Sequence, residues 1–274
     1  MVPIRLPDCG ILPAMNVRSR AARTFALAVF ALLLSAAAFA DEVRVITSGA
    51  FTAACLRLVS EFERTTQHTV VTTFGASMGS GPDTIPSRLQ RGEPADVVIL
   101  AGSALDELIR QGRVVAGSRV DLVRSGIGMA VAAGAPKPDI TSVEALTQTL
   151  LRAKSIAYSS SASGIYLSAE LFQRLGIAEQ IKGKTKISEG AVGVVVASGG
   201  AEIGFQQISE LLPVPGIDYV GPLPADVQRE TVFSAGIVSG ARAPGIGRAL
   251  VTFFTSPEAA PLIRKTGLEP ITAR

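Results

Sequence analysis

The sequence predicts an α/β protein built from two units, and three observations support this fold class. The 274 residues are enough for one or two domains with a substantial core. From residue 43 onward, short β-rich runs alternate with segments whose apolar residues recur at helical spacing. This βαβα order is typical of parallel-rich sheets with helices on both faces. The order occurs twice, without a solenoid period, so we expect two α/β lobes.

Individual elements follow from this alternation. Strands are expected at 43–47, 70–75, 96–102, 125–134, 156–159, 201–207, 217–223 and 231–238. Helices are expected at 48–66, 83–92, 103–112, after the proline-rich turn at 135–139, and around 164–175, 244–256 and 257–266. We expect lobe 1 to comprise residues 41–121 and 231–274, and lobe 2 residues 122–230.

The first 40 residues have the pattern of a secretory signal. From Met15, three arginines precede an apolar run, and Ala38-Phe39-Ala40 provides small residues before a cleavage site. The apolar run is short for a membrane span, and no second candidate follows it. We expect cleavage after about Ala40. Translation can begin at Met1 or at Met15, and in both cases residues 1–40 are leader.

The formal net charge of +3 belongs to the leader. Residues 1–40 contain four arginines and one acid, so the remaining chain has 22 basic and 22 acidic residues. A neutral chain gives no sign of the basic surface that nucleic acids require. We therefore expect no nucleic-acid partner.

The sequence offers no recognisable metal site or glycosidase-type acid pair. It contains no HExxH, no Cys/His cluster and no paired-carboxylate motif. The only histidine, His68, precedes a strand and therefore lies away from the carboxyl ends of the strands. Cys9 is lost with the leader, and the remaining Cys55 has the helical-core spacing of an inert buried thiol. We expect no metal and no cofactor.

Three strand-to-helix junctions are rich in serine and glycine. In an open α/β sheet such junctions lie at the carboxyl ends of strands, where ligands bind. Each is also a helix N-terminus, whose free N–H groups attract anions. Any one of them is explained by an ordinary cap or turn, but three in strand order favour a site for a small oxyanion or carboxylate. The candidate ligand residues are Ser48, Gly49, Ser77, Met78, Gly79, Ser160, Ser163 and Gly164.

The stretch 74–96, FGASMGSGPDTIPSRLQRGEPAD, is not a nucleotide loop, because it lacks the Lys-Ser/Thr step of a Walker motif. Arg88 lies one turn into the expected helix and could fork onto a ligand carboxylate, with an internal ion pair as the alternative. Gln206 offers an amide donor to the same crevice. If the site also carries out acid–base chemistry, the residue that would transfer the proton is unknown. The candidates are Tyr158, Tyr166, Asp83 and Ser160, and core packing is the alternative role for the two tyrosines.

The segments TSGAF, FGAS, RGEPADVVILAG, ASGIY, VASGGAEIGF and SPEAAPLI, in this order, resemble the periplasmic molybdate-binding-protein family. These are type II solute-binding proteins of ABC importers. The resemblance implies a two-lobed fold with an anion in the cleft, a periplasmic location, and an ABC permease as partner. By position, Ser48 and Ser77 match the ligand hydroxyls of that family. Tyr166, on the helix after the SSSASG loop, and Gln206, after the strand AEIGF, are further candidate ligand residues from their place in this chain. We expect a monomer.

Two departures from the molybdate binders favour a larger ligand. This chain has SMGSGPDTIPSRL after FGA, and Gln206-Gln207 in a stretch where the family usually has a tyrosine. The SMG, IPSRL, YSSSASG and GFQQISELLPV segments resemble instead the branch of this fold that isomerises aconitate, a tricarboxylate. Three functions therefore remain: a receptor for a small carboxylate or oxyanion, favoured by the missing acid–base constellation; an aconitate isomerase; and a molybdate or tungstate receptor.

Overall fold

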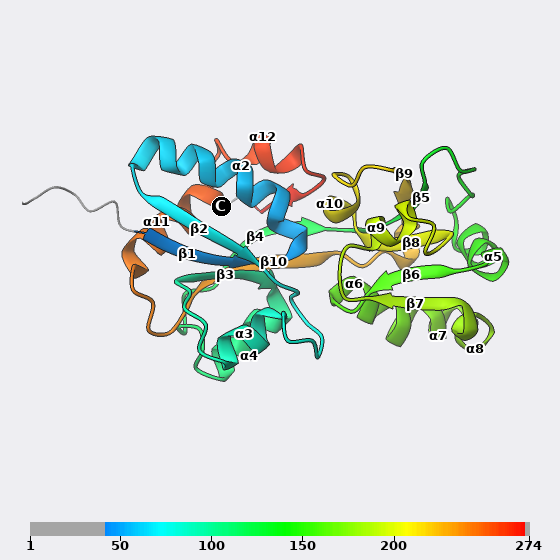
Figure 1. Ribbon diagram of the computed structural model, residues 1–274, viewed down its shortest axis with the longest axis horizontal. Coiled ribbons are helices and arrows are strands. Elements are labelled where there is room, and N and C mark those ends of the chain that lie inside the picture. The colour runs from blue at the N-terminus through cyan, green and yellow to red at the C-terminus, as the bar shows by residue number, and fades with distance from the viewer. Residues whose placement is uncertain (1–41, 272–274) are drawn as a thin grey trace, which may run out of the picture. The chain divides into compact units, whose positions relative to one another are not determined.

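The computed structural model describes residues 42–271, which belong to one compact unit. The expected leader at 1–40 and its cleavage site lie outside the described residues. Two sheets with flanking helices make up the described part (Figure 1). None of its helices combines the length and the apolar character that crossing a bilayer requires.

The first sheet has six strands and is mixed. β1 pairs in parallel with β2 and β3, whereas β10 runs antiparallel to β3 and β4, and β11 antiparallel to β4. In spatial order the strands are β11 (Glu269–Pro270), β4 (Val120–Ser125), β10 (Thr231–Ile237), β3 (Val97–Ala101), β1 (Glu42–Thr47) and β2 (Thr69–Phe74).

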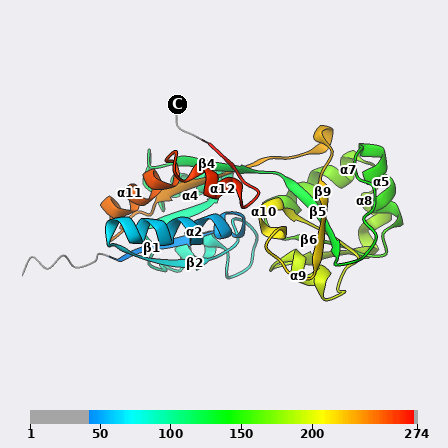
Figure 2. The ribbon, with the colours of Figure 1, turned by 90° about the horizontal axis from the view of Figure 1, so that it is seen from above.

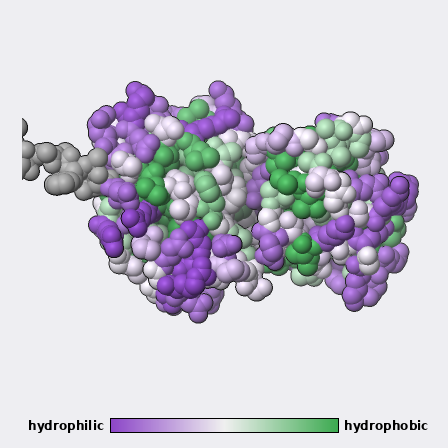
Figure 3. Space-filling model, viewed as in Figure 1, coloured by the Kyte–Doolittle hydropathy of each residue, from purple (hydrophilic) through white to green (hydrophobic). Residues whose placement is uncertain are grey.

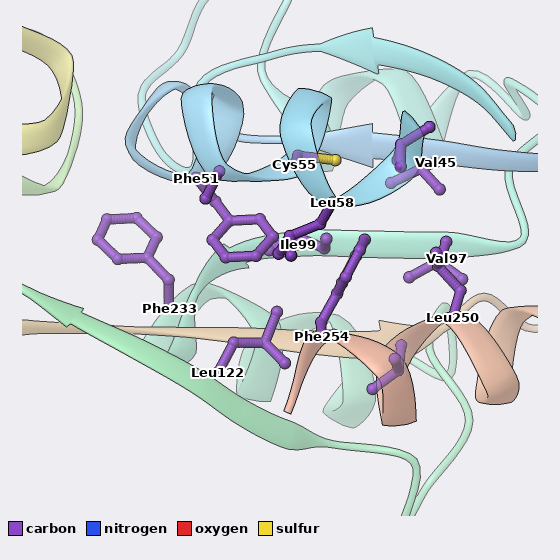
Figure 4. Packing of buried hydrophobic residues seen from close by; sticks show 14 of the residues in the cluster. Val45, Phe51, Cys55, Leu58, Val97, Ile99, Leu122, Phe233, Leu250 and Phe254 are labelled. Atoms are coloured by element: carbon purple, nitrogen blue, oxygen red, sulfur yellow. The ribbon is translucent and has the colours of Figure 1, made fainter. Parts of the chain in front are cut away.

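Helices cover both faces of this sheet (Figures 1 and 2). On one face lie α2 (Gly49–Thr66), α11 (Pro244–Phe254) and α12 (Ala260–Arg264), and on the other α3 (Ile85–Gln90) and α4 (Gly102–Arg110). The buried residues of α2 recur every three or four positions, which turns one apolar stripe toward the sheet. Phe51 of α2 meets Phe254 of α11 edge to face, with ring centroids 5.5 Å apart (Figure 4).

The second sheet has five strands and is also mixed. β6 is parallel to β7 and β8, whereas β5 is antiparallel to β8 and β9. In spatial order the strands are β7 (Thr185–Ser188), β6 (Ile156–Ser159), β8 (Ile203–Gln207), β5 (Ile127–Ala132) and β9 (Ile217–Pro222).

The helices of the second sheet also lie on two sides of it. α5 (Val143–Arg152), α6 (Ala162–Tyr166), a π-helical turn (Leu167–Leu171), α7 (Phe172–Arg174) and α8 (Ala178–Ile181) cover the larger core. α9 (Val192–Ala197) packs on the opposite face, and α10 (Ile208–Leu211) follows β8 directly. Short 3₁₀ turns occupy Lys182–Lys184 and Ala225–Val227.

The chain passes from the first sheet to the second between β4 and β5, and returns between β9 and β10. β10 therefore runs back along β4, and β3, β1 and β2, being parallel to β4, all end toward the second sheet. In the second sheet β8, β6 and β7 run against β5 and so end toward the first sheet. The carboxyl ends of the parallel strands in both sheets thus meet.

Several elements differ from the expected ones. Each sheet contains antiparallel pairs beside the expected parallel ones, because the strands that link the sheets run in both directions. The expected lobe boundary at 121–122 falls inside β4, which joins the first sheet as far as Ser125. The pattern also missed β7, whose only large apolar residue, Ile187, is 64% exposed on an edge strand.

On the face that Figure 3 shows, exposed apolar residues form small groups interrupted by hydrophilic side chains. The large exposed apolar residues of the described part are Leu56, Val71, Phe74, Val115, Ile165, Ile187, Val194 and Leu212.

Phe254→Ala should lower the free energy of unfolding by about 3–5 kcal/mol, because it opens a cavity between α2 and α11 in the first core. Denaturant unfolding measures this. The control Ile187→Ala, at an exposed edge position, should change stability by no more than about 0.5 kcal/mol. Equal effects of the two changes would contradict this description of the core.

Candidate functional site

A pocket of about 810 Å³ lies where the carboxyl ends of the parallel strands meet. One side is formed by the start of α2 and the loop between β2 and α3. The other side is formed by the residues after β6, β7 and β8. Its polar lining consists of Ser48, Thr52, Ser77, Asp83, Thr84, Ser159, Ser160, Ser161, Ser163, Ser188, Glu189, Gln206, Gln207, Ser209 and Glu210.

Ser48 and the first turn of α2 offer free donors to this pocket. Ser48 is the N-cap residue of the 18-residue helix α2. Its backbone is extended, and its side chain makes no capping hydrogen bond. Its Oγ is buried and has no hydrogen-bond partner among the described residues. A buried hydroxyl without a partner is costly unless a ligand supplies one. Together with the N-terminal N–H groups of α2, this hydroxyl suits an anionic oxygen.

Ser77 is oriented to donate as well. Its Oγ accepts a hydrogen bond of 2.9 Å from the backbone N–H of Ala101, which leaves its own proton free for a ligand. Across the pocket, the hydroxyls of Ser159 and Ser163 lie 3.1 Å apart. Donors on both sides can therefore contact one ligand at several points.

The glycine loop after β2 closes one edge of the pocket. Gly79 has a φ of +111°, which favours glycine, and a Cβ there would lie 3.4 Å from the carbonyl oxygen of Ser160. A Cβ on Gly81 would lie 3.2 Å from Glu189 Oε2, and the same oxygen accepts a hydrogen bond of 3.1 Å from Ser160 Oγ. The loop thus approaches the residues after β6 and β7 closely.

Glu210, which the sequence reasoning did not select, places a carboxyl group in the pocket wall. The half-buried Glu210 lies on α10, and α10 is tied to α2 by a 2.8 Å bond from Ser209 Oγ to the carbonyl of Ala50. The carboxyl lies against Gly49: a Cβ on that residue would be 2.0 Å from Glu210 Oε1. Gly49 therefore provides the space that the carboxyl fills.

Burial raises the pKa of Glu210 from its ordinary value of 4.5 to about 7, and a hydrogen bond with the Gln206 side chain opposes this shift. Gln206 Oε1 accepts from the N–H of Val192 at 2.9 Å, which leaves its amide nitrogen for the carboxyl. Titration of Glu210 thus falls near neutral pH.

The described lining contains no lysine or arginine. Anion binding here must use neutral donors: hydroxyls, amides and backbone N–H groups. The described residues also hold no cluster of three or more His, Cys, Asp or Glu side chains suited to a metal ion. Cys55 is buried on α2, and burial raises its thiol pKa to about 12, consistent with the inert role expected for it.

The structure brings about half of the expected site residues together. Ser48, Gly49, Ser77, Asp83, Ser160, Ser163 and Gln206 line the pocket. Gly79 lies beside it, against Ser160. Met78 packs instead against the cores on both faces of the first sheet. Gly164 is pressed against the backbone, where a Cβ would lie 1.6 Å from the carbonyl oxygen of Ser159.

Both candidate tyrosines are core residues in this structure. The ring of Tyr158 packs edge to face on Phe172 at 5.8 Å. The hydroxyl of Tyr166 donates a 2.7 Å bond to the carbonyl of Val227, and the guanidinium of Arg229 lies 4.6 Å from its ring centroid. Neither lines the pocket, so the packing alternative describes them better than proton transfer.

Arg88 also lies outside the pocket lining, and its guanidinium is used internally. It pairs with Glu93, donating a 2.8 Å bond from Nε, and reaches the carbonyl of Phe74 at 2.6 Å and the hydroxyl of Thr73 at 2.9 Å. The pairing raises the pKa of Arg88 and lowers that of Glu93. Arg88 thus holds the end of β2 against α3. This is the internal ion pair considered as the alternative to a ligand contact.

Arg88→Ala should lower the free energy of unfolding by about 3 kcal/mol, because it leaves Glu93 and the Phe74 carbonyl without their donor. Arg88→Lys should restore little, since an ammonium cannot reproduce the fork. Urea unfolding checks both, with Arg110→Ala, 72% exposed, as the control. A loss no larger than that of the control would contradict this structural role of Arg88.

Glu210→Gln should change how stability depends on pH. Because the folded-state pKa of Glu210 is raised, its contribution to stability is fully present below the unfolded pKa and is lost as pH rises from 4.5 through about 7. The variant lacks this loss. The melting temperature of the variant, relative to that of the wild type, should therefore rise between about pH 4 and about pH 8. For the control Glu179→Gln, at an exposed position, the curve of melting temperature against pH should run parallel to that of the wild type. A parallel curve for Glu210→Gln would contradict the raised pKa.

Comparison with known proteins agrees with this geometry. Residues 43–269 match the sequence profile of bacterial extracellular solute-binding proteins. An aconitate isomerase from a Pseudomonas species is 44% identical over 254 residues, 90% of this chain and 97% of the relative. The molybdate-binding protein ModA of Azotobacter vinelandii is 30% identical over 88% of this chain and 95% of the relative.

The solved structures give the fold. The periplasmic molybdate-binding protein of Azotobacter vinelandii has a TM-score of 0.68 at 20% identity, over 85% of this chain and 100% of that one. This likeness confirms the two-lobed type II fold expected from the sequence. The profile match covers most of the chain, and the alignments with the two relatives extend over nearly the whole length of each relative. The chain therefore belongs to the family of bacterial extracellular solute-binding proteins.

Proposed function

We propose that this protein is a periplasmic aconitate isomerase, which interconverts trans- and cis-aconitate. The observation that carries the proposal is the pocket of about 810 Å³ with neutral donors on both sides. This volume lies in the range of sites for organic ligands and leaves room for several carboxylates at once. The 44% identity to an aconitate isomerase over nearly its full length supports the same reading.

The donors suit a planar tricarboxylate. Ser48 and the N-terminus of α2 can hold one carboxylate, Ser77 a second, and the Ser159–Ser163 pair a third. The conversion is an allylic proton shift. A proton leaves the methylene carbon, its electron pair enters the conjugated system, and a proton is added at the former vinyl carbon. The dienolate formed between these steps places charge on carboxylate oxygen, where fixed N–H and O–H donors stabilise it.

A receptor for a small carboxylate or oxyanion, working with an ABC importer, is the second candidate. The observation that favours it is the absence of a cation from the described lining, since hydroxyls and N–H groups suffice to hold an anion that is not transformed. The 30% identical molybdate-binding relative supports this reading. A receptor would release its ligand unchanged and would need a permease as partner.

Incubation of the purified protein with trans-aconitate in deuterated buffer, followed by NMR, tests the proposal. We expect signals of cis-aconitate, with deuterium uptake if the moving proton exchanges with solvent. A Ser48→Ala/Ser77→Ala preparation controls for host enzymes and should lose turnover. Unchanged trans-aconitate together with a raised melting temperature would favour the carboxylate receptor. Stabilisation by molybdate or tungstate alone would favour the oxyanion receptor.

A further inference from the structure

Three carboxyl groups line the described pocket, and they differ in their surroundings. Asp83, the acid that the sequence suggested, is exposed. Glu189 is also exposed and already accepts a hydrogen bond from Ser160. Glu210 is half-buried on α10, and its carboxyl lies against Gly49. Only Glu210 therefore combines access to the pocket with partial removal from water.

We propose that the carboxylate of Glu210 takes the proton from the methylene carbon of aconitate and returns it to the other end of the allylic system. This inference rests on the proposed function, whose proton carrier the sequence left unassigned. One group can perform both transfers, because the two carbons are separated by a single atom and present the same face of a planar ligand.

The position of Glu210 relative to the free donors supports this role. Its Oε1 contacts Gly49, the first residue of α2, and the unpartnered Oγ of Ser48 belongs to the preceding residue. A ligand carboxylate bound at Ser48 and the N-terminus of α2 thus has Glu210 beside it. The carbon that loses the proton would lie next to the donors that receive the developing charge, as stabilisation of a dienolate requires.

The transfer conserves atoms and electrons. The Glu210 carboxylate gains the proton, the C–H bond pair becomes part of the dienolate, and the central double bond shifts by one position. The protonated carboxyl then gives the proton to the former vinyl carbon and is a carboxylate again. No oxidant, reductant or metal ion takes part.

Burial and the side-chain amide of Gln206 determine the pKa of Glu210, because no other charged group lies on the nearby parts of the elements packed against α10. The elements packed against α10 are α2, α9, β5 and β8. Of these, α9, β5 and β8 carry no ionisable side chain, and the first two turns of α2 carry only Cys55. Arg57, Glu61, Glu63 and Arg64 lie farther along α2. A pKa of about 7 matches the requirement that a general base titrate near the working pH.

Turnover should follow this titration. The ratio kcat/KM reports the free enzyme and should rise with pH up to about 7 before it levels off. The profile of kcat reports the complex and should rise at higher pH, because a bound anion raises the pKa of a neighbouring carboxyl. Glu210→Asp should retain part of the activity with a displaced profile.

The decisive experiment compares wild type, Glu210→Gln, Asp83→Asn and Glu189→Gln in the same NMR assay, with trans-aconitate binding measured by calorimetry. Exposed Glu179→Gln is the matched control. We expect Glu210→Gln to bind trans-aconitate but to lose turnover by at least about 100-fold, the usual lower limit for a general base. Binding by the variant also shows that it is folded.

The outcomes separate this inference from the proposed function. Turnover by wild type and by Glu210→Gln alike, or a pH profile that Glu210→Asp does not move, overturns the role of Glu210 and leaves the isomerase intact. Loss of turnover only in Asp83→Asn or Glu189→Gln transfers the role to that residue. Absence of turnover in the wild type rejects the isomerase, and the proton carrier with it.

Discussion

Strand direction is the constraint on which the rest of this structure depends. The chain enters the second sheet along β5 and returns along β10, and the other strands take their directions from pairing, directly or through neighbours, with these linking strands. As a result the parallel strands of both sheets end at one place. Each such end is followed by a turn or a helix start, whose N–H groups have no partner within the helix. The pocket is a consequence of this topology, and its serines and glycines adapt it to a ligand.

The site combines many neutral hydrogen-bond donors with one half-buried carboxyl group, that of Glu210. A lining without lysine or arginine avoids the large desolvation cost of buried cations, and its hydroxyls can rotate to fit ligands of different shape. Burial raises the pKa of Glu210, and only the hydrogen bond with Gln206 opposes this shift. The lining contains no lysine or arginine that would lower the pKa further.

The sequence predicted those parts of the site that are local in the chain. Ser48, Ser77, Ser160 and Ser163 stand at strand-to-helix junctions, and junctions are visible as a change in hydrophobic period. The expectation that the C-terminal residues return to the first lobe came from the resemblance to the molybdate-binding family, because periodicity alone does not show which lobe a segment joins.

What the sequence did not predict depends on contacts between distant segments. For Arg88 the sequence left a ligand carboxylate and an internal acid as possible partners, because a pattern does not show which of two anions an arginine will meet. In the structure it pairs with Glu93, five residues away. Glu210 was missed because α10 is a single turn and because Gly49, which makes room for its carboxyl, is far away in the chain. The nearby GFQQ motif was the one available signal.

The contact between Gly49 and Glu210 links two positions that lie far apart in the chain. No side chain at position 49, not even a methyl group, can coexist with the carboxyl in its present place. Substitution at either position therefore alters what the other can be, so the two form a coupled pair. With a larger residue at position 49, the Glu210 side chain would have to turn its carboxyl away from the start of α2. The two positions together therefore decide whether an acid lies beside the N-terminus of this helix.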